Sequence, residues 1–223
     1  MIVRIEVKGM NNREIAHYID HTLLKAFATW EQIEELCEEA IKYETASVCI
    51  PPNYISRVKA KYGDKFPVAT VIGFPLGYEA REAKLEECQV ALDDGADEID
   101  MVINISDVKN GAYDAVEDEI REMKHICGNH ILKVIVETCY LTEDEKVAMC
   151  KAVTAAGADY IKTSTGFGTA GATLEDVKLF KANIGPNVKI KAAGGVRTVE
   201  DMVSYIEAGC DRIGCSSTKV LFE

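Results

Sequence analysis

Short apolar segments rich in Val, Ile and Ala alternate along the chain with longer amphipathic segments. The short segments are typical of strands buried on both faces, and the longer ones have the apolar spacing of helices. We predict strands at 17–20, 46–50, 68–73, 98–104, 132–138, 160–163, 188–192 and 212–215. We predict helices at 30–43, 79–93, 113–126, 143–156, 174–182 and 199–208, with weaker support at 53–62. A short helix at 11–17 precedes the first strand, and about one turn follows the last.

This alternation indicates parallel strands joined by helical crossovers. Eight strands in 223 residues favour closure into a single (β/α)8 TIM barrel with a short extra N-terminal helix, filling residues 1–223 as one domain. An open, doubly wound sheet is the alternative, because counting strands does not distinguish the two.

A repeated tripeptide, Gly-Ala-Asp or Gly-Cys-Asp, ends three of the predicted helices, at 95–97, 157–159 and 209–211. Glycine in the left-handed conformation stops a helix, and each tripeptide leads into a short apolar strand. Five residues beyond each glycine lie Asp100, Lys162 and Gly214. Equal offsets predict comparable depths along the three strands, where the carboxyl ends of a barrel carry the active site.

Acidic residues outnumber basic ones, 37 to 25, which gives a formal net charge of −12. This charge argues against nucleic acid or an anionic membrane as the main partner, because both require clustered Lys and Arg. A small phosphorylated molecule stays possible, since a few local donors hold it.

The eight cysteines lie in apolar patterns, and no pair has CxxC spacing. They therefore resemble small buried hydrophobic residues rather than a disulfide framework. No apolar run is long enough to span a bilayer, and the first residues contain no apolar core of a signal peptide. We expect a reduced, cytoplasmic protein.

Lys162 carries the sharpest chemical signal. Strand alternation directs Ile161 outward and Lys162 inward. A strand lysine alone more often extends to solvent, but Lys191 lies inward on the next strand, above Lys189. Burial and a second ammonium both lower a lysine pKa, and the neutral amine attacks carbonyl groups. We predict that Lys162 is a Schiff-base nucleophile and that Lys191 lowers its pKa.

Asp100 lies between apolar neighbours, where a carboxylate requires a partner. It can pair with the two lysines, and it can also move protons during imine formation. Glu98 shares its face and is the lower, structural member. Asp20, at the end of the first strand, is a candidate for orienting a lysine or a substrate hydroxyl in the pocket, with capping of the next segment as the alternative.

Three late loops, 164–168, 194–197 and 214–217, are rich in glycine and hydroxyl groups. Such loops bind phosphate through backbone N–H groups, and barrels often place this site after the last two strands. The candidate binding residues are Thr165, Gly166, Phe167, Gly194, Gly195, Val196, Arg197, Gly214, Ser216 and Ser217. Arg197 either adds a charge at the anion or forms a salt bridge at the rim.

Metal and thiol chemistry have weaker support. His17 and His21 are four residues apart but lack the glutamate of an HExxH motif. We therefore predict neither a metal nor a cofactor. Cys49 ends the second strand, and a packed thiol is favoured over a pocket residue.

The segments IDHTLL, SVCIPP, VIGFPLG, EIDMVINI, VIVET, YIKTSTGFG, KAAGGVR and RIGCSS occur in order from about Ile19 to Ser217. Together they resemble the deoxyribose-phosphate aldolase family, with Phe167 where some members have lysine. The resemblance implies reversible, metal-free cleavage of 2-deoxy-D-ribose 5-phosphate to D-glyceraldehyde 3-phosphate and acetaldehyde, in deoxyribonucleoside breakdown. It implies that Lys162 forms the Schiff base, Asp100 relays protons and Lys191 is the second lysine.

Two other function classes are weighed against this one. A sugar-phosphate isomerase or transaldolase-like enzyme also binds phosphate in a barrel, but an isomerase requires a carboxylate base and not two interior lysines. A non-catalytic sugar-phosphate-binding barrel has no need of Asp100, Lys162 and Lys191 together. Barrels of this type are commonly homodimers or homotetramers, which is the state we expect.

Overall fold

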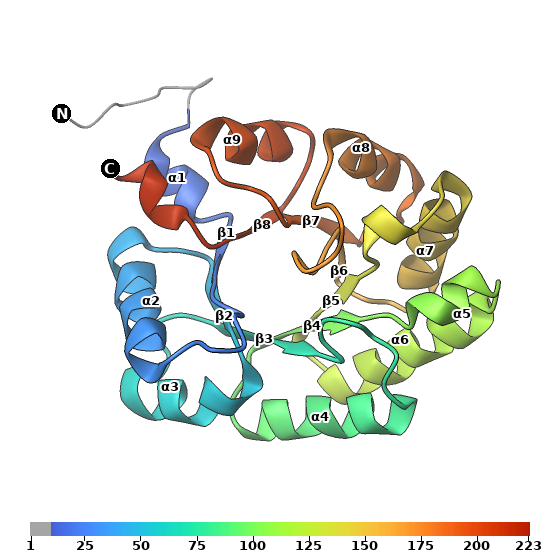
Figure 1. Ribbon diagram of the computed structural model, residues 1–223, viewed down its shortest axis with the longest axis horizontal. Coiled ribbons are helices and arrows are strands. Elements are labelled where there is room, and N and C mark those ends of the chain that lie inside the picture. Colours follow the sequence, from blue (N-terminus) through green and yellow to red (C-terminus); the bar gives the residue numbers. More distant parts are fainter. Residues whose placement is uncertain (1–9) are drawn as a thin grey trace.

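The computed structural model describes residues 10–223, which form a closed barrel of eight parallel strands surrounded by helices (Figure 1). β1 pairs with both β2 and β8, so the sheet closes and the open-sheet alternative is excluded. The strands are β1 Ile19–Thr22, β2 Ser47–Ile50, β3 Val68–Ile72, β4 Glu98–Val102, β5 Ile131–Ile135, β6 Tyr160–Lys162, β7 Lys189–Ala193 and β8 Arg212–Cys215.

The α-helices are α1 Asn12–Ala16, α2 Trp30–Tyr43, α3 Ile55–Tyr62, α4 Arg81–Asp93, α5 Ile105–Lys109, α6 Tyr113–Cys127, α7 Glu143–Ala155, α8 Leu174–Asn183 and α9 Val199–Glu207. Short 3-10 helices occupy Pro52–Tyr54, Thr138–Tyr140 and Thr218–Leu221. Several α-helices begin at a threonine whose side chain accepts a backbone N–H, as at Thr29, Thr142 and Thr198. Among residues 10–223, no helix has the length and apolarity needed to cross a membrane. The predicted absence of a signal peptide concerns the first residues, of which 1–9 lie outside the described range.

Several predicted boundaries differ from the structure; the strand predicted at 132–138, for example, ends at Ile135. Two of the differences have clear local reasons. β1 begins at Ile19 rather than residue 17, because the Tyr18 N–H bonds back to Ile15 O and completes the turn that ends α1. β4 ends at Val102 because the Asn104 side chain accepts two backbone N–H groups and starts α5, a helix that apolar spacing did not predict.

The repeated tripeptides act as predicted. Gly95, Gly157 and Gly209 all have positive φ, at 104°, 77° and 106°. Each ends a helical segment and directs the chain into β4, β6 or β8.

The outward strand residues pack against the helices and form the main apolar core, whereas the barrel interior is largely polar and charged. Strand register places the interior side chains in layers of four, drawn from alternate strands. From the amino end, the layers are Ser47, Glu98, Tyr160 and Arg212; then Asp20, Ala69, Lys133 and Lys191; then Cys49, Asp100, Lys162 and Gly214. Asp100, Lys162 and Gly214 therefore share one layer, as their equal offsets predicted.

Candidate active site

A cavity of about 380 Å³ opens at the carboxyl ends of β1, β6, β7 and β8. Its lining residues are Thr22, Leu23, Leu24, Lys25, Lys162, Thr165, Gly166, Phe167, Ala193, Gly194, Gly195, Val196, Arg197, Gly214, Cys215 and Ser216. The charged members are Lys25, Lys162 and Arg197, all cationic. Although the chain has a net charge of −12, this cavity favours an anion.

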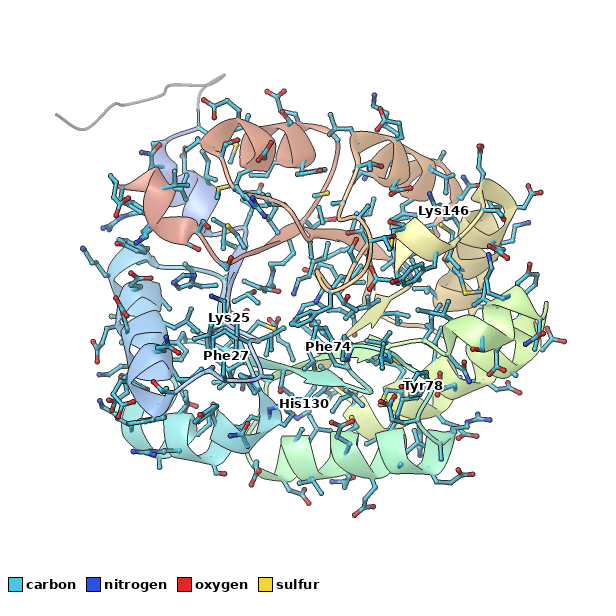
Figure 2. All side chains as sticks on the ribbon, in the orientation of Figure 1. Lys25, Phe27, Phe74, Tyr78, His130 and Lys146 are labelled. Carbon is cyan, nitrogen blue, oxygen red and sulfur yellow. The ribbon has the colours of Figure 1, made fainter. Side chains whose placement is uncertain are left out.

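A second cavity, of about 320 Å³, adjoins the first across the loop after β1. The two cavities share Leu24, Lys25 and Phe167, and the second is otherwise lined mainly by apolar residues that include Val71 and Phe74. In Figure 2, Phe74 lies near the centre of the barrel and Lys25 to its left, on the side of β1 and β2. Phe74 meets Phe167 edge to face, with ring centroids 5.3 Å apart, so aromatic rings separate the two halves of the mouth.

Lys162 borders the first cavity, although only 3% of its surface is exposed. Its Nζ lies 2.7 Å from Asp100 Oδ2, and Lys191 Nζ lies 2.6 Å from the same oxygen. The other oxygen, Asp100 Oδ1, accepts a hydrogen bond from Lys133 Nζ at 2.8 Å. One buried carboxylate thus joins three lysines on β5, β6 and β7.

The network continues downward to the amino end of the barrel. Asp20 accepts a hydrogen bond from Lys191, and its Oδ1 lies 2.6 Å from Arg212 Nη1. Glu98 lies 2.6 Å from Lys133 and also contacts Arg212. Glu98 is therefore the lower, structural carboxylate that its position on β4 predicted.

The three interior layers hold one more cation than anion. The anions are Asp20, Glu98 and Asp100, and the cations are Lys133, Lys162, Lys191 and Arg212. A buried net charge is unfavourable, so the network is neutral when one of these lysines loses its proton.

The surroundings of each lysine determine which of the three loses its proton most readily. Burial lowers the pKa of Lys162; Asp100 opposes this and Lys191 reinforces it, and the net pKa is below the usual lysine value. Burial also lowers the pKa of Lys191, but Asp100 and Asp20 more than compensate, and its net pKa is raised. For Lys133, burial is likewise overcome by Asp100, Asp20 and Glu98, which hold its pKa well above the usual value. Lys162 is therefore the lysine that becomes a neutral amine most readily.

Asp100 remains a carboxylate in this setting. Burial raises the pKa of Asp100, but the charges of Lys133, Lys162 and Lys191 lower it by more. The net pKa is therefore well below the usual range. Asp100 accordingly accepts hydrogen bonds from its lysine neighbours and carries no proton of its own at neutral pH.

Sequence reasoning missed Lys133, which is fully buried and central to this network. The signal was present, because Lys133 alternates with Leu132 and Val134 in an apolar strand. It lies outside the Gly-Ala-Asp repeat, so its depth relative to Asp100 required the β4–β5 register, in which the two residues are direct partners.

Of the roles predicted for Asp20, the structure supports orienting a lysine and does not place it at the lining of the pocket. Asp20 is fully buried, one layer below Lys162, and does not line the cavity. Its carboxylate is enclosed by Ser47, Lys191 and Arg212, so it orients a lysine. Asp100 and Lys191 are also fully buried and do not line the cavity. Asp100 contacts Lys162, which does line it, and Lys191 contacts the same Asp100 oxygen.

The three predicted glycine-rich loops meet at the cavity, after β6, β7 and β8. Gly194 has a φ of 84°, and its Cα would lie only 3.0 Å from a Cβ at Gly171, so these two loops touch through glycines. Gly214 lines the cavity, and a Cβ there would lie 2.9 Å from Ala193 Cβ and 3.4 Å from Lys191 Cε, so glycine allows β8 to pack closely on the side chains of β7.

Two of the predicted phosphate contacts are placed differently by the structure. Ser217 does not line the cavity, and its N–H donates a hydrogen bond to Cys215 Sγ. Thr165 lines it, but both its N–H and its hydroxyl bond to Glu137, a residue that sequence reasoning did not single out. The guanidinium of Arg197 has no ion-pair partner among residues 10–223, so the rim salt bridge is absent from that range.

The cavity also contains residues that were not predicted: Thr22, Leu23, Leu24, Lys25, Ala193 and Cys215. Leu23, Leu24 and Lys25 directly follow β1, and all carboxyl ends of parallel strands face the same mouth. Applied to the residues that follow β1, that rule is the signal by which Lys25 could have been found as a further cation.

The remaining candidates are structural. His21 is buried between Glu39 and Thr218. Within residues 10–223, no cluster of three or more His, Cys, Asp or Glu side chains is arranged to hold a metal. Cys49 is fully buried, burial raises the pKa of its thiol, and it lies in the layer of Lys162 as a packed side chain.

A (β/α)8 barrel with a buried, readily deprotonated lysine beside a cationic cavity defines a class, the barrel aldolases that act through an amine. The chain belongs to the DeoC/LacD family aldolases, whose pattern matches residues 14–219.

Relatives extend this match over nearly the whole chain. The deoxyribose-phosphate aldolase of Clostridium botulinum (strain Eklund 17B / Type B) is 69% identical over 93% of this chain and 94% of its own. The enzyme of that name from Clostridioides difficile (strain 630) is 55% identical over 92% of this chain and 94% of its own. A deoxyribose phosphate aldolase structure from Aeropyrum pernix, described as tetrameric, superposes with a TM-score of 0.87 at 33% identity, covering 95% of this chain and 91% of its own.

Proposed function

We propose that this chain is a class I aldolase that reversibly cleaves 2-deoxy-D-ribose 5-phosphate to D-glyceraldehyde 3-phosphate and acetaldehyde. The observation that carries the proposal is Lys162, a buried lysine of lowered pKa that borders a cavity with only cationic charged residues. The named relatives supply the substrate, and the cavity fits it in charge.

The reaction begins at the aldehyde carbon, C1. The neutral Lys162 amine attacks C1, and loss of water from the carbinolamine gives an iminium ion. This step requires a proton for the departing hydroxyl, and Lys191 is the source we assign, because its ammonium shares Asp100 Oδ2 with Lys162.

Cleavage breaks the C2–C3 bond. A base removes the proton of the C3 hydroxyl, C3 becomes the aldehyde of glyceraldehyde 3-phosphate, and the bonding electrons enter the iminium to form an enamine. Protonation of C2 and addition of water then release acetaldehyde and regenerate the amine. Asp100 is the carboxylate nearest to Lys162, and we assign it, with Lys191, to these proton transfers.

The phosphate is assigned to the opposite part of the cavity. Lys25 and Arg197 supply positive charge there, and Gly166, Gly194 and Gly195 supply backbone N–H groups. The proposal gives Asp20 and Lys133 a supporting role, since both hold the charged network in place without reaching the cavity.

A sugar-phosphate isomerase is less compatible with this cavity. That chemistry requires a carboxylate base but makes no use of a neutral amine, whereas a lysine of lowered pKa, Lys162, borders the cavity.

Borohydride trapping tests the proposal. Incubation with acetaldehyde followed by reduction is expected to add one ethyl group to the intact chain, located by peptide mass at Lys162. Lys162→Ala is expected to show no such adduct, whereas Lys189→Ala, which removes an exposed lysine from β7, is expected to match the unmodified sequence. An adduct that persists in Lys162→Ala would refute the assignment of the nucleophile.

Three broader assignments accompany this function. We propose that residues 1–223 act as one barrel domain and that the protein is a homo-oligomer, with the tetrameric Aeropyrum pernix structure as precedent. We also propose a cytoplasmic location, supported by eight cysteines that are all free thiols. Light scattering on the purified protein tests the oligomeric state.

A further inference from the structure

Glu137 follows β5 at the carboxyl end of the barrel in an unusual backbone conformation. Its φ and ψ are 53° and 67°, in the left-handed region that non-glycine residues seldom occupy. Among residues 10–223, the other non-glycine residue with positive φ is Glu44, which is exposed and ends α2. Glu137 is only 2% exposed, so its conformation directs a carboxylate into the protein.

That carboxylate is bonded to the loop after β6. The Thr165 N–H lies 3.3 Å from both Glu137 oxygens, and the Thr165 hydroxyl donates to Oε2. The hydroxyl oxygen of Thr165, Oγ1, in turn accepts a hydrogen bond from the Phe167 N–H at 3.0 Å. Two backbone N–H groups of the loop therefore depend, directly or through one hydroxyl, on Glu137.

The loop also packs closely on this carboxylate. A Cβ at Gly168 would lie 2.8 Å from Cys139 Sγ and 3.1 Å from Glu137 Cδ, so only glycine fits there without displacement. Beneath it, the Thr138 N–H bonds to Thr163 O at 2.9 Å. The loops after β5 and β6 are thus joined from Thr163 to Gly168.

The residues fixed in this way are those that face the cavity. Thr165, Gly166 and Phe167 line it three to five positions after Lys162, whereas Glu137 does not. Gly166 lies between the anchored N–H groups of Thr165 and Phe167 and lines the cavity, and its own N–H makes no hydrogen bond to another of residues 10–223.

We infer that Glu137 is a positioning residue for phosphate recognition: it holds residues 163–168 in the conformation that presents Gly166 to the phosphate. The inference rests on the proposed function, because it assigns the phosphate of that substrate to this loop. Glu137 acts on binding through Thr165 and takes no part in the chemistry at Lys162.

The test compares 2-deoxyribose 5-phosphate with 2-deoxyribose, which lacks the phosphate. Glu137→Ala is expected to lower kcat/KM for the phosphorylated sugar about tenfold or more, mainly through KM, because charged hydrogen bonds to the loop are lost. It is expected to leave kcat/KM for 2-deoxyribose within about twofold. Glu137→Gln keeps one acceptor oxygen and is expected to lose less.

Two further variants separate positioning from general damage. Thr165→Val removes the hydroxyl that links Glu137 to Phe167 and is expected to cause the same selective loss, and the double variant is expected to lose less than the two effects multiplied together. Glu44→Ala, at the other left-handed glutamate, is expected to change neither substrate.

An equal loss on both sugars, or no loss on either, would overturn the inference. Acetaldehyde trapping distinguishes this from failure of the proposed function: no adduct in the unmodified protein refutes the function, whereas a normal adduct with unchanged phosphate preference in Glu137→Ala refutes only the role of Glu137. If Glu137→Ala does not fold, Glu137→Gln and Thr165→Val decide the question by the same ratio.

Discussion

Replacing Lys191 by methionine tests whether the charge of this lysine controls the pKa of Lys162. The change removes one positive charge from the network and preserves most of the side-chain volume. The network then holds three carboxylates, and the remaining cations Lys133, Arg212 and Lys162 balance them only if Lys162 is protonated. The expected direction is a higher pKa for Lys162.

The magnitude follows from the geometry. The Nζ atoms of Lys162 and Lys191 lie 2.7 and 2.6 Å from the same Asp100 oxygen. Two unit charges about 5 Å apart repel by about 3 kcal/mol at an effective dielectric constant of 20. Loss of that repulsion corresponds to a rise of about two in the pKa of Lys162.

The assay is the rate of borohydride-trapped adduct formation with acetaldehyde between pH 5 and 10, about the range in which a lysine of lowered pKa titrates. The neutral amine reacts, so the rate rises with pH through the pKa of Lys162, and a higher pKa moves this rise to higher pH. In Lys191→Met, the midpoint is expected to move up by about two pH units, with a lower rate at the alkaline end because the proton donor for the departing hydroxyl is lost. Lys191→Arg keeps the charge and is expected to leave the midpoint nearly unchanged.

An unchanged midpoint in Lys191→Met would refute this reasoning, whatever the change in rate. Lys191 would then act only by proton transfer or substrate binding, and burial alone would lower the pKa of Lys162. Thermal unfolding of both variants is the control, because Asp20 loses one of its partners when Lys191 is replaced.

Lys133→Met is expected to reduce the free energy of unfolding by about 3–5 kcal/mol, measured in urea, because Asp100 and Glu98 lose a fully buried partner; a loss below about 1 kcal/mol would contradict the structural role assigned to it. Arg197→Ala is expected to raise KM for 2-deoxyribose 5-phosphate about tenfold and to leave kcat within about twofold, and an unchanged KM would remove Arg197 from the phosphate site. Activity is expected to persist in excess chelator, because the proposed chemistry uses an amine rather than a Lewis acid, and its loss there would point to a metal.

The layered interior explains how far sequence reasoning reached. Period-two alternation placed Lys162, Lys191, Asp100 and Glu98 inward, because a side chain's face follows from position along the strand alone. The equal offsets from the three helix-ending glycines also predicted how far along their strands Asp100, Lys162 and Gly214 lie, since each of these helices ends at the same distance before its strand.

The same reasoning failed where an answer depended on pairs of strands. Asp20 was assigned to the pocket, but the β1–β8 register pairs it with Gly214. Each layer is drawn from alternate strands, so register partners fall in successive layers, and Asp20 lies one layer below Gly214 and Lys162. Lys133 was overlooked, although it is the direct register partner of Asp100. Glu137 reaches Thr165 because of a left-handed backbone conformation, which the letters VIVET do not encode.

The sequence by itself therefore determined the alternation of strands and helices, the inward lysines and the glycine-rich loops, because local periodicity and turn chemistry specify them. Closure of the sheet into a barrel was decided by the pairing of β1 with β8. Only the tertiary structure decided which charges meet. The register and tilt of eight strands bring three carboxylates and four cations together, and the surroundings of each lysine make Lys162 the one that loses its proton most readily.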